Sequence, residues 1–355
     1  MHRYTLHFEL STADASGAPV CIAGNFNNWN ENEYKMKEIG KGAYELELDL
    51  EWKIEQPIEY KFIRTRWTNV EVDEYGSYVP NRIIEDPQEK IVAWVPRWRS
   101  DGEVCDKDLM PLIEFHSLRL PKARKDRRVS VLLPYDYHQT TKSYPVLYLM
   151  DGQNLFEDSA PFGSWEINTK LAILAEKQMH EVIMVCIDHA GVKRIEEYVF
   201  PSHKNEKGKG SEYVNWIIKT LIPFINKKYR TYTDANNTGI GGSSLGGLIS
   251  LMAGVTHPQS FGKLMLLSPS LWKIMDLIYD RMMYLPLISN NQYIYLYGGK
   301  KEASNMTGFL TDFYSQLMQI DPANDRVHLN INESGEHSEK FWGKEFPFAL
   351  KYLFY

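Results

Sequence analysis

The stretch NNTGIGGSSLGGLISLMAGV joins an apolar segment to a run with helical spacing through a glycine-rich bend that carries two adjacent serines. A sharp strand-to-helix turn of this kind, G-x-S-x-G, holds a serine above the end of a sheet. Strand and helix nearly touch two residues on either side of that serine. For Ser244 those positions are Gly242 and Gly246, whereas for Ser243 one of them is Leu245, whose side chain would clash. The bend therefore predicts Ser244 as the exposed serine.

A glycine-rich bend between a strand and a helix can instead bind phosphate through its backbone N–H groups. Neither G-x-x-x-x-G-K-[ST] nor G-x-G-x-x-G fits this segment. The interpretation of the serine as a nucleophile then depends on whether the rest of the chain supplies a base and an acid.

The pattern of the chain changes after its first third. Residues 1–97 alternate apolar and polar residues in short runs such as YTLHFEL and PIEYKFIRT, which is typical of a small all-β, immunoglobulin-like sandwich. The stretch VPRWRSDGEVCDKDLMP carries prolines and charges with little periodicity, so residues 98–111 are predicted to be a linker. From 112 to 355, near-continuous apolar runs such as EVIMVCIDH alternate with helical segments. This pattern predicts a doubly wound, mostly parallel sheet covered on both faces.

Composition excludes several classes of partner. The 355 residues are 43% apolar and 24% charged, with a formal net charge of −6, so neither nucleic acid nor an anionic membrane is expected. The chain shows no apolar run of membrane-spanning length and no signal-peptide pattern, which predicts a cytoplasmic protein. Cys21, Cys105 and Cys186 are scattered without metal-ligand spacing, so free thiols and no metal or cofactor are expected. No pattern indicates an oligomeric state.

A serine nucleophile needs a general base that is oriented by a carboxylate, and in doubly wound hydrolases the chain order is serine, acid, histidine. Three histidines follow Ser244. His257 lies just beyond the elbow helix, before any later acid, and is interpreted as a loop residue. His328 alternates with apolar residues of a strand and is interpreted as structural. His337 lies in the polar loop ESGEHSEKFW after the last strand, where active-site residues of parallel sheets gather, so it is predicted as the base.

Glu302 is predicted as the acid because it ends the loop GGKKE, directly after the strand YIYLYGG. Asp312 is the second candidate, in a helical context away from the carboxyl end of a strand. The alternative for Glu302 is a solvated loop carboxylate beside Lys300 and Lys301.

An oxyanion needs two preorganised donors. One is expected to be the backbone N–H of Leu245, directly after the nucleophile. The other is expected from PVLYLMDGQNLF, where Gly152 permits a turn and Gln153 or Asn154 can present an N–H. Gln153 is preferred.

Several segments together resemble the putative-esterase family of α/β-hydrolases over residues 112–355: the run from LPKARKDRRVSVLLP to MDGQNLF, RIEEYVFPSHKNEKGKG, GGSSLGG, SPSLW and GEHSEKFW. That family includes enterochelin esterase-like and feruloyl esterase-like members. The resemblance implies Ser244 as nucleophile, Glu302 as acid and His337 as base in a metal-independent serine esterase. It also implies that four further residues lie near the substrate: Arg194, Glu197, Tyr198 and Trp272. A surface ion pair and packed aromatics are the alternatives for these four.

The resemblance implies hydrolysis of an ester of a sugar, phenolic acid or siderophore through an acyl-enzyme. Two alternatives stay open, namely acyl transfer to an alcohol on the same triad and a glycan-binding protein with an inactive hydrolase domain. An intact serine, acid and histidine argue against the second alternative.

Residues 1–97 resemble a starch-binding type of carbohydrate-binding module through VCIAGNFNNWN, PIEYKFIR and PNR. Such modules stack sugars on exposed tryptophans, and Trp29 matches one of these positions. At the second position stands Val72, and Trp67 occurs five residues earlier. Trp29 and Trp67 are thus candidate α-glucan contacts. One platform alone predicts weak binding or none, and a purely structural module is the alternative.

Overall fold

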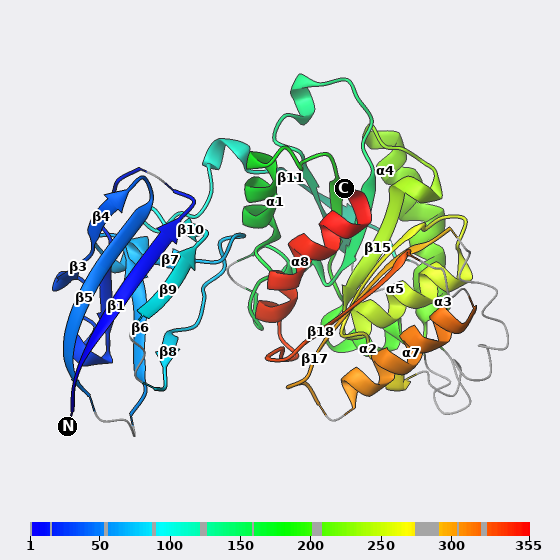
Figure 1. Ribbon diagram of the computed structural model, residues 1–355. Coiled ribbons are helices and arrows are strands. Elements are labelled where there is room, and N and C mark those ends of the chain that lie inside the picture. The colour runs from blue at the N-terminus through cyan, green and yellow to red at the C-terminus, as the bar shows by residue number, and fades with distance from the viewer. Residues whose placement is uncertain are drawn as a thin grey trace. The chain divides into compact units, whose positions relative to one another are not determined.

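The computed structural model describes residues 2–14, 16–52, 56–86, 90–120, 126–157, 160–200, 208–273, 291–303, 305–320 and 325–355, and the statements below concern these residues. The chain forms two compact units, Met1–Lys107 and Asp108–Tyr355 (Figure 1). The division falls within residues 98–111, where the sequence predicts a linker. The N-terminal unit extends past residue 97 because Trp98 is buried in its core.

The N-terminal unit is an all-β sandwich of two four-stranded sheets, ordered β4-β5-β1-β9 and β3-β2-β6-β8, with a small β10-β7 pair. Its strands are His2–Thr12 (β1), Cys21–Gly24 (β2), Tyr34–Lys35 (β3), Lys37–Gly40 (β4), Ala43–Trp52 (β5), Ile58–Ile63 (β6), Glu71–Val72 (β7), Arg82–Ile84 (β8), Lys90–Val95 (β9) and Arg97–Trp98 (β10). Neighbouring strands are antiparallel except β1 and β9. Alternate residues such as Phe8 of β1 and Phe62 of β6 fill one core, as the period-two pattern predicts.

The C-terminal unit is built on one eight-stranded sheet ordered β11-β12-β14-β13-β15-β16-β17-β18. Its strands are Leu112–Leu118 (β11), Arg127–Leu133 (β12), Val146–Met150 (β13), Ile183–Ile187 (β14), Thr238–Ser243 (β15), Lys263–Leu267 (β16), Tyr293–Gly299 (β17) and Val327–Asn332 (β18). The pairs β11–β12 and β12–β14 are antiparallel, and the remaining pairs are parallel. The predicted α/β-hydrolase fold with a mostly parallel sheet is confirmed.

Helices cover both faces of this sheet (Figure 1). They are Ile167–Glu176 (α1), Arg194–Tyr198 (α2), Gly210–Trp216 (α3), Ile222–Lys228 (α4), Leu245–Thr256 (α5), Met306–Ile320 (α7) and Glu339–Phe354 (α8), with the π-helix Ile217–Leu221 (η7) between α3 and α4. Short 3-10 helices lie at Asn25–Asn27 (η1), Trp67–Asn69 (η2), Lys107–Leu109 (η3), Tyr137–Gln139 (η4), Gly152–Asn154 (η5), Gly191–Lys193 (η6), Ala235–Asn237 (η8) and Leu271–Lys273 (η9). Helices α1 and α8 pack together, and α2, α3 and α5 form another group. Among the described residues, no helix combines the length and apolarity needed to cross a bilayer.

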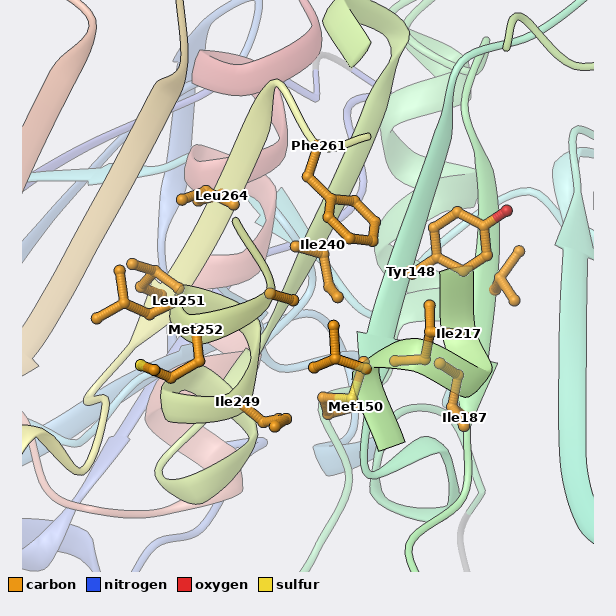
Figure 2. Packing of buried hydrophobic residues seen from close by; sticks show 14 of the residues in the cluster. Tyr148, Met150, Ile187, Ile217, Ile240, Ile249, Leu251, Met252, Phe261 and Leu264 are labelled. Atoms are coloured by element: carbon orange, nitrogen blue, oxygen red, sulfur yellow. The ribbon is translucent and has the colours of Figure 1, made fainter. Parts of the chain in front are cut away.

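The central strands are apolar throughout because each of their faces meets helices. In β13, Tyr148 and Met150 point into a cluster shared with side chains of β15 and α5 (Figure 2). Leu147 points to the opposite layer, where it and Phe354 of α8 each lie 3.0 Å from the β-carbon position of Gly239. All residues of β13 are buried. The period-two alternation of polarity is absent because neither face meets water.

Strand order places the functional loops. Strand β14, which follows β13 in the chain, pairs with one edge of β13, and β15 pairs with the other edge. Loops that leave β13 and β15 therefore diverge at their carboxyl ends, which is where ligands bind in open α/β sheets. Asp151 follows β13 and Ser244 follows β15, so both residues lie at this point of the sheet.

Candidate active site

The bend after β15 is a nucleophile elbow. Ser244 connects β15 directly to α5 and has a positive φ of 55°. A β-carbon on Gly242 would lie 2.9 Å from the carbonyl carbon of Gly246, and one on Gly246 would lie 2.8 Å from Oδ2 of Asp151. Both positions therefore require glycine. A positive φ at a residue other than glycine costs about 1–3 kcal/mol and clusters at functional sites. Ser243, by contrast, belongs to β15 and is 5% exposed.

The structure brings Ser244, His337 and Glu302 into one chain of hydrogen bonds. His337 Nε2 lies 3.0 Å from Ser244 Oγ, and His337 Nδ1 lies 2.7 Å from Glu302 Oε2. The side chain of Glu302 is 0% exposed, whereas that of His337 is 34% exposed. A carboxylate on Nδ1 favours the tautomer with its proton there, which leaves the Nε2 lone pair directed at the serine hydroxyl. This geometry can remove a proton from Ser244.

The other candidates for base and acid lie elsewhere. His257 caps the C-terminus of α5. His328 stacks on Tyr295 with ring centroids 4.8 Å apart, as expected for a structural residue of β18. Asp312 is exposed on α7.

Glu302 is held by donors that the sequence analysis did not identify. Its Oε1 accepts hydrogen bonds from Ser268 Oγ at 2.6 Å and from the N–H of Gly299 at 2.7 Å. Ser268 Oγ in turn accepts a bond from Trp342 Nε1 at 2.9 Å. Ser268 is the first polar residue after the apolar strand KLMLL, at the carboxyl end of the sheet. This position could have indicated from the sequence that Ser268 belongs to the site.

The predicted oxyanion donors lie at the ends of adjacent strands. Leu245 opens α5 and Gln153 lies in η5, so both N–H groups belong to first helical turns, where donors have no partner within the helix. The turn into η5 is tight, because a β-carbon on Gly152 would lie 2.8 Å from Oδ1 of Asp188. The side chain of Gln153 accepts a hydrogen bond from the N–H of His189 at 3.0 Å. The oxyanion role of both groups remains a prediction.

Arg194 supports the loop that carries Gln153. Its Nε and a terminal nitrogen each lie 2.7 Å from one carboxylate oxygen of Asp151, the residue between β13 and η5. The Arg194 side chain is 24% exposed and that of Asp151 is 7% exposed. The bidentate geometry fixes the guanidinium plane beside the elbow.

Glu197 and Tyr198 pack into the interior of the unit. Both carboxylate oxygens of Glu197 lie 2.8 Å from a terminal nitrogen of Arg127, and burial raises the pKa of this carboxyl. Tyr198 is 0% exposed and packs on Tyr213 with ring centroids 5.3 Å apart. Burial raises the pKa of Tyr198 well above its usual value. Both side chains are buried, and a substrate contact for either of them stays a prediction.

Trp272 lies in η9 with 43% of its surface exposed. It follows Ser270, whose N–H donates to the carbonyl of Ser244 at 3.1 Å. The Ser270 hydroxyl lies 3.3 Å from that of Ser244. An exposed indole at this position can contact an aromatic or sugar ring.

One further pair near the site was missed from sequence. Asn154 Nδ2 donates to Glu339 Oε1 at 2.9 Å, which ties η5 to the first residue of α8. Burial raises the pKa of Glu339. The contact joins the loop of Gln153 to the segment that carries His337.

In the N-terminal unit, the two candidate glycan contacts lie together. The rings of Trp29 and Trp67 have centroids 6.0 Å apart at an interplanar angle of 51°, and Trp67 is 38% exposed. Val72, at the family's second platform position, is 1% exposed. The rings of Trp29 and Trp67 therefore adjoin, where the sequence predicts a single aromatic platform. Within the described ranges, no group of three or more His, Cys, Asp or Glu side chains forms a candidate metal site.

Comparisons with known proteins give a family match and several similar chains. The family described as "Putative esterase" matches residues 121–353. The protein YbbA of Bacillus subtilis is 23% identical over 243 residues, which cover 64% of this chain and 93% of YbbA. The esterase Rv1288 of Mycobacterium tuberculosis is 31% identical over 127 residues, 35% of this chain and 25% of that protein. The enterobactin esterase of Shigella flexneri superposes with a TM-score of 0.56 at 15% identity, covering 98% of this chain and 92% of that one. At this identity, the likeness to the solved structure shows the fold alone.

Proposed function

Because this chain belongs to the family described as "Putative esterase", we propose that it is a serine esterase that cleaves carboxylic esters through an acyl-enzyme. Ser244 is the nucleophile, His337 the general base and acid, and Glu302 the carboxylate that orients the imidazole. The N–H groups of Leu245 and Gln153 hold the oxyanion.

One observation carries the proposal, namely the continuous hydrogen-bond path from Glu302 through His337 to Ser244, at 2.7 Å and 3.0 Å. The path lies at the elbow, where Ser244 has a positive φ. A serine hydroxyl is a weak nucleophile unless a base within hydrogen-bond reach removes its proton. The path supports such a proton transfer.

In the reaction, His337 Nε2 takes the proton of Ser244 while Oγ attacks the ester carbonyl carbon. The negative charge that develops on the carbonyl oxygen is stabilised by the N–H groups of Leu245 and Gln153. Collapse of the tetrahedral intermediate breaks the bond to the alcohol, which receives the proton from His337. Water then repeats the sequence on the acyl-enzyme and releases the acid.

For the substrate, we propose an ester of a sugar, a phenolic acid or a siderophore. Two residues support a ring-bearing, polar substrate. Trp272, two residues after Ser270, exposes its indole, and the guanidinium of Arg194 has N–H groups beyond the two that bond Asp151. The esterase of Shigella flexneri was crystallised in the presence of enterobactin, which is one reason to include a siderophore ester in the test.

The test is a screen of ester classes with the full chain. We expect turnover of p-nitrophenyl acetate and of at least one class among acetylated sugars, feruloylated sugars and siderophore trilactones. Ser244→Ala should abolish turnover and covalent labelling by a fluorophosphonate, whereas Ser243→Ala should keep both. Labelling that persists in the Ser244→Ala variant would contradict the assignment. Product analysis with an added alcohol separates hydrolysis from acyl transfer.

We also propose a weak α-glucan contact in the N-terminal unit. The adjoining rings of Trp29 and Trp67 support it, because stacked sugars need an exposed aromatic surface. Isothermal titration calorimetry of the full chain with maltoheptaose tests this second function independently of the first.

A further inference from the structure

Trp342 and Ser268 form a chain of hydrogen bonds, here called the arm, that ends on Glu302, the carboxylate of the triad. Trp342 of α8 donates from Nε1 to Ser268 Oγ at 2.9 Å, and Ser268 Oγ lies 2.6 Å from Glu302 Oε1. An indole N–H can only donate, so the serine oxygen accepts from the indole. The hydroxyl proton of Ser268 is then directed at Glu302. Both bonds therefore have a fixed direction, from Trp342 toward the acid.

The arm is rigid at Ser268. Ser268 is 0% exposed, has a φ of 45° and donates its N–H to the carbonyl of Tyr297 at 2.7 Å. A left-handed backbone at a buried serine is retained only where the surroundings determine it. Ser268 is thus held directly after β16, with its N–H bonded to β17, the strand that precedes the acid.

The arm also reaches the base. The ring of Trp342, which is 4% exposed, stands edge-on to the imidazole of His337, with centroids 4.7 Å apart and an interplanar angle of 85°. One side chain therefore contacts His337 directly and reaches Glu302 through Ser268. A shift of Trp342 would disturb both partners of the acid–base pair.

The two oxygens of the Glu302 carboxylate have different hydrogen-bond partners. Oε1 of Glu302 accepts from Ser268 and from the N–H of Gly299, and Oε2 accepts from His337 Nδ1. A buried polar oxygen that lacks a hydrogen-bond partner is costly, and these donors satisfy both oxygens. Because two donors hold Oε1, the carboxylate is kept in the orientation that directs Oε2 at the imidazole.

We propose that Ser268 and Trp342 are positioning residues of the triad, which hold Glu302 and His337 in register with Ser244. This inference rests on the proposed esterase function. The arm lies behind the acid and acts through it, so its loss should lower kcat and leave KM nearly unchanged.

The test compares Ser268→Ala and Trp342→Phe with Ser250→Ala. Ser250 is a matched control because it is also 0% exposed and its hydroxyl donates one hydrogen bond, at 2.7 Å to the carbonyl of Gly246 within α5. Substitution of residues that orient functional groups in this way typically costs about 10- to 100-fold. We expect kcat for a p-nitrophenyl ester to fall by this factor in Ser268→Ala and by a smaller factor in Trp342→Phe. Ser250→Ala should match the wild type, and KM should change by less than about twofold in all three.

A double-mutant cycle separates positioning from general destabilisation. In a Glu302→Gln background, Ser268→Ala should have almost no further effect on kcat, because the residue through which it acts is already altered. An equal loss in both backgrounds would overturn the proposal. Rates are expressed per active site titrated with a fluorophosphonate. If Ser268→Ala does not fold, Trp342→Phe decides alone, and wild-type kcat in that variant overturns the proposal.

The fluorophosphonate also separates this inference from the function on which it rests. Absence of labelling in the wild type, or labelling in Ser244→Ala, would contradict the esterase proposal. Normal labelling of Ser244 in the wild type, with the same rate in Ser268→Ala, would overturn only the role of the arm.

Discussion

The two units hold their candidate residues in different ways. In the C-terminal unit, Ser244, Glu302 and His337 come from separate strand ends and are joined by directional hydrogen bonds, with Glu302 fully enclosed. In the N-terminal unit, Trp29 and Trp67 follow or open short 3-10 turns and contact each other through their rings. Bond cleavage requires atoms in fixed relative positions, whereas stacking on a sugar tolerates displacement because it is spread over ring surfaces. The predictions below test this contrast.

The largest expected effect is that of the triad acting as a unit. Ser244→Ala and His337→Ala should each lower kcat for ester hydrolysis by about 10⁴- to 10⁶-fold, and the double variant should be no slower than either single one. Steady-state kinetics on p-nitrophenyl acetate measure this. His328→Ala is the control, and we expect it to change the melting temperature more than kcat. A double variant that is far slower than both single ones would mean that the two residues act separately.

Replacement of the enclosed acid should have the next largest effect. Glu302→Gln keeps the shape of the side chain, but an amide cannot stabilise the imidazolium and favours the wrong tautomer. We expect kcat to fall by roughly 10³- to 10⁴-fold with the fold intact, as judged by circular dichroism. Asp312→Asn, on the exposed face of α7, should have wild-type kinetics. The acid is misassigned if the Asp312→Asn variant is the impaired one.

Two of the arginine–carboxylate pairs of the C-terminal unit, Arg127–Glu197 and Arg194–Asp151, should separate activity from stability. Arg127→Met leaves the buried carboxylate of Glu197 without its partner, so we expect a loss of about 3 kcal/mol in the free energy of unfolding with kcat retained. Arg194→Met frees Asp151 beside the elbow, so we expect kcat/KM to fall roughly tenfold or more. Denaturant titration and kinetics on both variants measure the difference. Equal effects of the two substitutions on kcat/KM would remove Arg194 from the site.

The smallest effect is expected in the N-terminal unit. We expect millimolar affinity for maltoheptaose or none detectable, and where binding is measured, Trp29→Ala and Trp67→Ala should each weaken it by about three- to tenfold. Isothermal titration calorimetry on the full chain measures this, with unchanged hydrolysis of p-nitrophenyl acetate as the control. Tight binding that survives Trp29→Ala would show that the glycan contacts another surface.

The sequence analysis predicted the triad residue by residue, because the chemistry demands particular residue types in a particular chain order. The steric argument for Ser244 over Ser243 needs only the glycine spacing, and the structure places its glycines against Met150 and Asp151. Glu197 and Tyr198 show what such prediction leaves open. They lie in the expected segment, yet α2 turns both side chains into the interior. The direction of a side chain on a short helix depends on what packs against that helix.

The sequence by itself determined the two architectures and predicted Ser244, Glu302 and His337 as the candidate triad, because local periodicity, turn sterics and reaction chemistry act on neighbouring or ordered residues. Only the tertiary structure decided that Ser268 and Trp342 support Glu302, that Arg194 holds Asp151, and that Trp29 meets Trp67. Each of these contacts joins residues from different segments of the chain. Hydrogen bonds and ring contacts act over a few ångströms, and such distances between remote segments exist only after the strands and helices have packed.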